Sequence, residues 1–303
     1  MAEPARGGAS LLDPEVMQAI GPLDVVATRI VEGLLAGQHR SPLKGSSVEF
    51  AEHRAYSPGD ETRLIDWHAY ARSDRYYIRQ FEEQTNLAAT LVLDASGSMA
   101  FGMSTISKLR WAQVAMACLA RLLLHQGDAV GLMAVGPGPP RHLAPRAVPA
   151  QFQAVHNELA RLQPAGQGAL APALVELAPR LRRRGLVLIC ADCFEELEPL
   201  VKAMGHLRGR GQDVVLLHVM APEELAFDFK RVSQFQSLEA DGERIDLDPA
   251  VVRQRYLDRV NRFLKELRYG CAEIGCDYVL ARTDVPIGPT LAHLLGRRAT
   301  GKG

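Results

Sequence analysis

Four apolar runs of strand length are the feature that most constrains the fold of this chain. They span residues 87–93, 129–135, 185–191 and 213–219, and segments of helical periodicity separate them. A strand that is apolar at nearly every position has to be buried on both faces. Such strands in alternation with helices indicate a parallel sheet that helices cover on both sides. The sequence therefore predicts an α/β fold with a doubly wound, mostly parallel sheet.

The segments between these runs have the spacing of amphipathic helices. Residues 108–126 place Trp111, Ala115, Cys118 and Leu122 on one stripe, and this spacing favours a helix with one buried face. Further elements are expected as helices at 150–162, 170–182, 195–208, from Asp248-Pro249 onward and near 289–295, as strands at 76–83 and 277–281, and as a hairpin over 231–247.

The N-terminal part of the chain is less regular than the rest. Residues 1–10 are small and Gly-rich, which is typical of a disordered terminus. A helical stripe from Leu23 to Leu34 stops at Gly37, and residues 38–60 are polar with several Pro and Gly residues, which favours loops and turns. We therefore divide the chain into a disordered N-terminus (1–10), an N-terminal extension (11–84), an α/β domain (85–295) and a flexible C-terminus (296–303).

Charge and hydropathy argue against two classes of partner. Acidic and basic residues balance at 35 each, so no net field attracts nucleic acid or an anionic membrane. No stretch approaches the ~18 uninterrupted apolar residues of a membrane-spanning helix. The N-terminus also lacks the charged-then-apolar order of a secretory signal. The sequence thus predicts a cytoplasmic protein that neither inserts into membranes nor binds nucleic acid.

The five cysteines are Cys118, Cys190, Cys193, Cys271 and Cys276. An odd number of cysteines in a chain without a secretory signal favours a reducing compartment. Cys190 and Cys193 form a C-x-x-C at a predicted strand end rather than at a helix start. Two interpretations remain, a redox pair or buried thiols, and the position at a strand end favours buried thiols.

A cluster of small oxygen-bearing side chains follows the first apolar run, in the stretch LAATLVLDASGSMAFG. Asp94, Ser96 and Ser98 come directly after a buried strand, and parallel sheets bind ligands at the carboxyl ends of their strands. One carboxylate and two hydroxyls are oxygen ligands of the kind that Mg²⁺ takes, with positions left for water or for another acid. Alternatively, Asp94 and the serines cap the backbone turn that follows.

The same stretch resembles the metal-ion-dependent adhesion site of von Willebrand factor A domains, which share this alternating architecture. The resemblance implies that Asp94, Ser96 and Ser98 form the first metal-binding loop. It also implies that Asp192, after the third apolar run, supplies a further ligand. The second loop of that family supplies a threonine, and Gly168 stands at this position here. A weakened Mg²⁺ or Mn²⁺ site that lacks one oxygen ligand is therefore expected.

A second stretch, RAYSPGDETRLIDWHAYAR at residues 54–72, resembles the signature of the domain-of-unknown-function 58 (DUF58) family. The resemblance covers most of residues 40–290. In this stretch, Pro58 and Gly59 suit a turn, after which Asp60 can cap a helix. The charged residues form either an ion-pair clamp that fixes the segment to the sheet or a partner-binding surface. The matching residues are Arg54, Tyr56, Pro58, Gly59, Asp60, Arg63, Ile65, Asp66, Trp67, Ala71 and Arg72.

The sequence lacks the common enzyme signatures. It contains neither a G-x-x-x-x-G-K-[ST] phosphate loop nor a G-x-S-x-G elbow, and its histidines form no metal-binding pair. The enzyme alternative is Mg²⁺-dependent phosphoryl transfer with Asp94 as the nucleophile. Ser96, however, stands where haloacid-dehalogenase-like phosphatases carry a second acid, which protonates the leaving group.

The DUF58 resemblance instead implies a non-catalytic protein-interaction module. The implied partners are a MoxR-type ATPase of the AAA+ class and an unidentified client protein, which the pair would assemble or activate in the manner of a chaperone. In this interpretation the ATPase supplies the energy and the present chain supplies recognition.

Overall fold

The structure is a computed structural model, and it describes residues 23–38, 53–55, 70, 72, 76–79, 87–103, 106–182, 184–228, 233–236, 244–247 and 249–300. The chain forms two compact units, of which the second is Pro42–Asn86 and the first contains the rest. Within the second unit, β1 (His53–Ala55) pairs antiparallel with β2 (Tyr77–Arg79). The predicted metal ligands all belong to the first unit.

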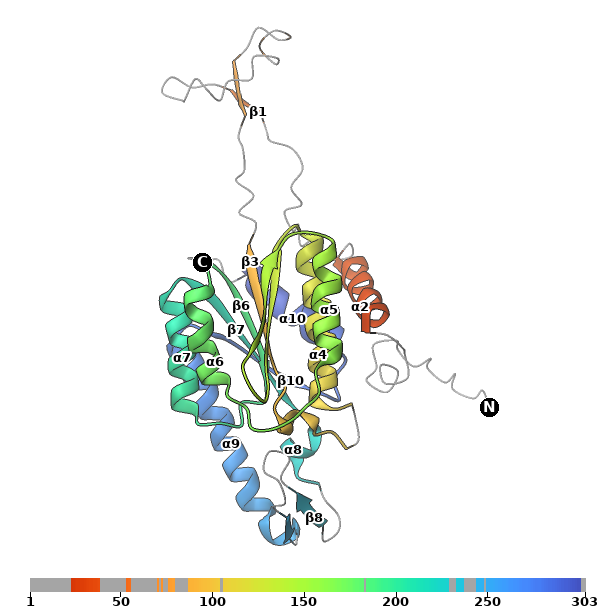
Figure 1. Ribbon diagram of the computed structural model, residues 1–303, viewed down its shortest axis with the longest axis vertical. Coiled ribbons are helices and arrows are strands. Elements are labelled where there is room, and N and C mark those ends of the chain that lie inside the picture. Colours follow the sequence, from red (N-terminus) through yellow and green to blue (C-terminus); the bar gives the residue numbers. More distant parts are fainter. Residues whose placement is uncertain are drawn as a thin grey trace, which may run out of the picture. The chain divides into compact units, whose positions relative to one another are not determined.

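A six-stranded sheet forms the middle layer of the first unit (Figure 1). Neighbouring strands are parallel except at one edge, where β5 runs antiparallel to β4. The predicted α/β fold with a doubly wound, mostly parallel sheet is thus confirmed. In spatial order the strands are β10 (Asp277–Arg282), β7 (Gln212–Met220), β6 (Gly185–Ala191), β3 (Ala88–Asp94), β4 (Ala129–Val135) and β5 (Arg141–Arg146).

Helices cover both faces of this sheet, as Figure 1 shows. The helices on one face are α2 (Leu23–Gln38), α4 (Lys108–His125), α5 (Ala150–Arg161) and α10 (Ile287–Thr300). Those on the other face are α6 (Leu170–Leu177), α7 (Leu197–Gly209) and α9 (Pro249–Glu273). Two smaller elements follow β7, namely the short helix α8 (Pro222–Ala226) and the hairpin of β8 (Ser233–Gln236) and β9 (Arg244–Leu247). Within the described residues, no helix is both long and apolar enough to cross a membrane.

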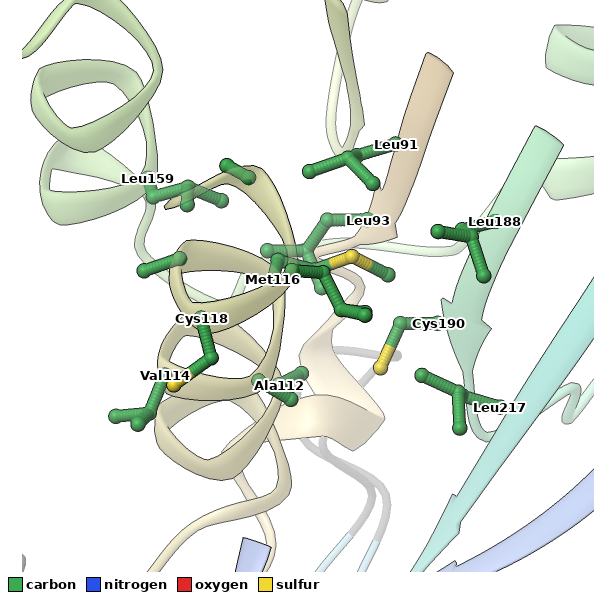
Figure 2. Close-up of a cluster of buried hydrophobic side chains, with 14 of the residues drawn as sticks. Leu91, Leu93, Ala112, Val114, Met116, Cys118, Leu159, Leu188, Cys190 and Leu217 are labelled. Atoms are coloured by element: carbon green, nitrogen blue, oxygen red, sulfur yellow. The ribbon is translucent and has the colours of Figure 1, made fainter. Parts of the chain in front are cut away.

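Successive side chains of the central strands enter two different cores, because strand residues alternate between the faces of a sheet. Leu91 and Leu93 of β3 pack in the first core, with α2, α4, α5 and α10, whereas Val92 packs in the second core, with α6, α7 and α9. Figure 2 shows the first core, in which Met116 of α4 faces the strands that carry Leu93 and Cys190. Burial on both faces explains why these strands are apolar at nearly every position.

Two elements of the sheet domain differ from the sequence predictions. Strand β5 has no predicted counterpart, because it contains Pro145 and its side chains are half-buried or exposed, so no apolar run marks it. The helix expected over 170–182 ends at Leu177 and is followed by a 3₁₀ turn over Ala178–Arg180. Pro179 stands inside that turn, and proline cannot donate the next helical hydrogen bond.

Helix α2 lies in a different unit from the motif at residues 54–72. The sequence analysis placed both in one extension, residues 11–84. In the structure, Val26 and Ile30 of α2 are buried in the first core, and the unit boundary follows α2. The helical stripe that begins at Leu23 therefore belongs to the α/β domain.

Gly185 begins strand β6 at a point where neighbouring groups come very close. A Cβ atom at this position would lie 2.6 Å from the Ala88 carbonyl oxygen and 2.7 Å from Gln212 Oε1. We expect Gly185→Ala to lower the free energy of unfolding by about 1–3 kcal/mol, the usual cost of overpacking. Urea denaturation would measure this change, with Gly209→Ala as the control because no atom lies within 4 Å of a Cβ there. Equal effects of the two substitutions would contradict the packing explanation.

Candidate functional site

The two aspartates predicted as metal ligands lie at the same edge of the sheet. Asp94 is the last residue of β3, and Asp192 directly follows β6. These strands are parallel neighbours, with Leu93 paired to Cys190. Both carboxyl groups are buried, and they lie at the carboxyl ends of adjacent strands, where sheets of this type bind ligands.

The loop after β3 brings Asp94, Ser96 and Ser98 together. The Ser96 N–H donates a hydrogen bond to Asp94 Oδ1 over 2.9 Å, and the Ser96 and Ser98 hydroxyl oxygens lie 3.0 Å apart. Asp94 therefore accepts from its own backbone turn, as the capping hypothesis predicts. Ser96 precedes a 3₁₀ turn over Gly97–Ala100, yet its side chain makes no capping hydrogen bond. The two hydroxyls thus interact with each other, beside the Asp94 carboxyl group.

A second loop, which leads into α6, packs against the first. The Gly97 N–H donates a hydrogen bond to the Gly166 carbonyl over 2.8 Å. A Cβ atom at Gly168 would lie 3.1 Å from Ser96 Cβ and 3.7 Å from Asp94 Oδ1. A threonine at position 168 would therefore contact the cluster, and glycine leaves that space open.

The Asp192 carboxylate is paired with a buried cation, Lys108. The Lys108 Nζ atom lies 2.7 Å from Asp192 Oδ2 and 2.6 Å from Glu224 Oε1, and the lysine is 0% exposed. The other Asp192 oxygen, Oδ1, accepts a hydrogen bond from the Phe194 N–H over 3.3 Å. Both side-chain oxygens of Asp192 therefore have partners, and it shares its cation with Glu224.

The sequence analysis missed both Lys108 and Glu224. Lys108 is the first residue of α4, where Ser107 caps the helix by accepting a hydrogen bond from the Arg110 N–H over 3.2 Å. Glu224 lies in α8, and its Oε2 accepts from the Ala221 N–H over 2.7 Å. The position of Lys108 at the start of a helix was a sequence signal that could have pointed to its role. A helix that follows a parallel strand begins at the carboxyl edge, so a cation in its first turn can reach the carboxylates there.

Asp94 has no ion-pair partner among the described side chains, and its surroundings disfavour a negative charge. Burial raises the pKa of Asp94 from its ordinary 3.8 to about 7, and the charge of Asp192 adds to this rise. Hydrogen bonds from Ser96 act in the opposite direction without cancelling it, and Glu195 raises the pKa a little further. The Asp94 carboxylate at neutral pH would therefore be stabilised by a cation.

His218 makes a hydrogen bond to the backbone of Asp192. The imidazole Nε2 lies 2.9 Å from the Asp192 carbonyl oxygen, and Nδ1 lies 2.8 Å from the Tyr278 hydroxyl. Because a carbonyl only accepts, Nε2 donates to it. Burial lowers the pKa of His218 to about 4, so at neutral pH Nδ1 accepts a hydrogen bond from Tyr278. The loop that carries Asp192 is thus held from both its side chain and its backbone.

The residues of the 54–72 motif lie in the second unit, and the structure describes few of them. Arg54 is in β1, where its backbone pairs with Ile78 of β2, and Arg72 is exposed. For this motif the ion-pair clamp and the partner-binding surface both stay predictions. The motif residues outside the described part of the chain are Tyr56, Pro58, Gly59, Asp60, Arg63, Ile65, Asp66, Trp67 and Ala71.

The residues at the sheet edge fit a divalent cation in part. Asp94, Ser96 and Ser98 offer one carboxylate and two hydroxyls in close contact, and hard cations take such ligands. Asp192 has both oxygens engaged by other groups. Across the described residues, no group of three or more His, Cys, Asp and Glu side chains is placed to hold a metal ion. The donor set therefore fits a weak site centred on the Asp94 loop.

Several solved structures are similar to this chain at low sequence identity. BatB from Bacteroides thetaiotaomicron is 16% identical with a TM-score of 0.48, over 71% of this chain and 100% of that one. An aerotolerance-related membrane protein from Bacteroides fragilis is 17% identical with a TM-score of 0.47, over 70% and 98%. The SpRpn10 VWA domain is 16% identical with a TM-score of 0.39, over 68% and 94%.

Curated relatives and a protein family are identified at the level of sequence. Uncharacterized proteins of Mycobacterium tuberculosis and Mycobacterium bovis are 31% identical over 186 residues, which is 59% of this chain. The chain spans 58% of the length of these relatives. Residues 52–264 match the family described as "Protein of unknown function DUF58". This chain therefore belongs to the DUF58 family, as the stretch at residues 54–72 predicted.

Proposed function

We propose that this chain is a non-catalytic protein-interaction module whose contact point is the Asp94 loop. The observation that supports this most is the contrast between the two aspartates at the sheet edge. Asp192 is ion-paired with Lys108, whereas Asp94 is 4% exposed and has no cation beside it among the described side chains. A buried carboxylate without a counter-charge is costly, and a bound cation would remove that cost.

In this proposal Asp94, Ser96 and Ser98 hold Mg²⁺ or Mn²⁺ weakly. When bound, the ion supplies positive charge and open coordination positions, one of which an acidic side chain of the partner protein fills. Asp94 provides the negative charge, and the two hydroxyls, whose oxygens lie 3.0 Å apart, provide two neutral oxygen ligands. Gly168 provides no oxygen, so affinity for the metal alone stays low and the partner completes the site.

The partners in this proposal are a MoxR-type AAA+ ATPase and a client protein. The support for them is the DUF58 family membership together with the resemblance of the sheet-edge loop to adhesion sites. The chain itself contains no phosphate loop, so the energy for remodelling a client would come from the ATPase. The present module would supply recognition.

A binding assay between this chain and a purified MoxR-type ATPase from the same organism tests the proposal. We expect binding in Mg²⁺ to weaken at least tenfold in Asp94→Asn and on chelation, because mutation of even the groups that orient a metal's ligands typically costs 10–100-fold in affinity. Gly168→Thr, which places a hydroxyl against Asp94, is expected to tighten Mn²⁺ binding in calorimetry. Asp258→Asn, on the exposed face of α9, is the control. Binding that is indifferent to both chelation and Asp94→Asn would refute the role of this loop.

A further inference from the structure

The ammonium group of Lys108 is buried at the same edge of the sheet where the metal is expected. It comes from the start of α4 and contacts the loop after β6 through Asp192 and helix α8 through Glu224. Its Nζ atom also lies 4.7 Å from the centre of the Phe194 ring. One side chain therefore joins three segments that are far apart in the sequence.

The contacts of Lys108 limit what Asp192 can do. Asp192 Oδ2 is 2.7 Å from the ammonium, and Oδ1 is occupied by the Phe194 N–H. A divalent ion bound through Asp192 would have to share an oxygen with one of these donors or displace it, and it would lie close to a second positive charge. Like charges in a poorly hydrated site repel strongly, so the ammonium and a metal ion compete for this carboxylate.

The second carboxylate makes the lysine difficult to displace. Glu224 Oε1 is 2.6 Å from Nζ, and Glu224 is itself held by the Ala221 N–H. Removing the ammonium from between two buried carboxylates would leave both uncompensated, which is strongly unfavourable. The position of Lys108 is therefore fixed by the protein and does not depend on whether a metal is present.

We propose that Lys108 is the resident cation of this site, which keeps Asp192 out of the metal's coordination shell and so sets the divalent-metal affinity low. This inference rests on the proposed function, because it concerns the same loop cluster. It assigns the two aspartates different tasks. Asp94 meets the exchangeable cation, whereas Asp192 is a positioning residue that ties the neighbouring loop to Lys108 and α8.

Calorimetric Mn²⁺ titration of a charge-balanced variant tests this assignment. Lys108→Met combined with Glu224→Gln removes the ammonium and its second carboxylate and leaves Asp192 available. We expect the double variant to bind Mn²⁺ at least tenfold more tightly than the wild type, with a larger rise in melting temperature on adding Mn²⁺. Adding Asp192→Asn should abolish the gain. The control is Lys265→Met with Glu266→Gln, an exposed pair on α9.

Single variants test the assignment if the double variant does not fold. Asp192→Asn in the otherwise unchanged chain should weaken Mn²⁺ binding much less than Asp94→Asn does, because Asp192 acts on the ion only through its charge and does not contact it. A loss of Mn²⁺ affinity as large as that of Asp94→Asn overturns the inference. Equal Mn²⁺ affinity of the wild type and the double variant also overturns the inference, although it leaves the proposed metal site intact. If only the double variant binds Mn²⁺, the inference is supported and the metal is removed from the proposed function. If neither protein binds Mn²⁺, the inference and the proposed metal site are both refuted.

Discussion

Asp94→Asn is expected to raise the free energy of unfolding at pH 8 by as much as about 4 kcal/mol and to change it little near pH 4. Burial, and secondarily the charge of Asp192, raise the pKa of Asp94 from 3.8 to about 7 in the folded protein. A shift of this size corresponds to roughly 4 kcal/mol. Asparagine keeps the Oδ1 acceptor for the Ser96 N–H, so the substitution removes the charge and retains that hydrogen bond.

The direction of the pH dependence follows from proton binding. Between pH 3.8 and about 7 the folded protein holds a proton on Asp94 that the unfolded chain releases. The stability that Asp94 contributes is therefore present below pH 3.8 and is lost as pH rises through about 7. Urea denaturation at several pH values, with a metal chelator present, would measure the difference, and Asp258→Asn is the control. A stabilisation that does not grow between pH 4 and pH 8 would argue against an uncompensated charge on Asp94.

Lys108→Met is expected to lower the free energy of unfolding by about 3–5 kcal/mol, because it leaves the Asp192 and Glu224 carboxylates buried without their cation. Methionine fills a similar volume, so the loss reflects charge more than packing. Replacing both acids as well, in Lys108→Met/Asp192→Asn/Glu224→Gln, should recover most of the stability. Denaturant titration at pH 8 of the wild type and both variants would measure the two effects.

A surface ion pair provides the comparison for this prediction. Arg180 lies 2.6 Å from Glu176 on the exposed side of the α6 segment, and loss of such a pair costs about 1 kcal/mol or less. Arg180→Met should therefore have a small effect. If Lys108→Met costs no more than Arg180→Met, or if the triple variant is as unstable as Lys108→Met, the ammonium is not what compensates the two acids.

The sequence predicts the central layer of this fold well, because burial on both faces requires apolar residues at successive strand positions. Strands β3, β4, β6 and β7 all lie where apolar runs stand. The edge strand β5 escapes the same analysis, since it is covered on fewer sides and contains Pro145. The sequence pattern also does not show to which unit α2 belongs. An apolar stripe indicates that one face of a helix is buried, but it does not identify the elements that cover this face.

The candidate site is predictable to the extent that strand ends determine it. Asp94 and Asp192 each end or follow a buried strand, so their common location can be derived from the pattern alone. Lys108 could not be derived in this way. Its long side chain reaches from a helix start to a loop, and Glu224 meets it from a short helix after β7. Neither periodicity nor spacing encodes which lysine is enclosed, since lysine is usually solvated.

The distribution of the cysteines gives the protein its own reporters of local opening. All five are buried thiols. Cys118 and Cys190 lie in the first core, while Cys193, Cys271 and Cys276 lie in the second. Burial also raises the pKa of the Cys118 and Cys190 thiols, which leaves them unreactive while the core is closed. A thiol reagent can then modify each cysteine only during transient exposure. Labelling rates resolved by residue would therefore measure the rates of local opening of the two cores separately, in a chain without substitutions.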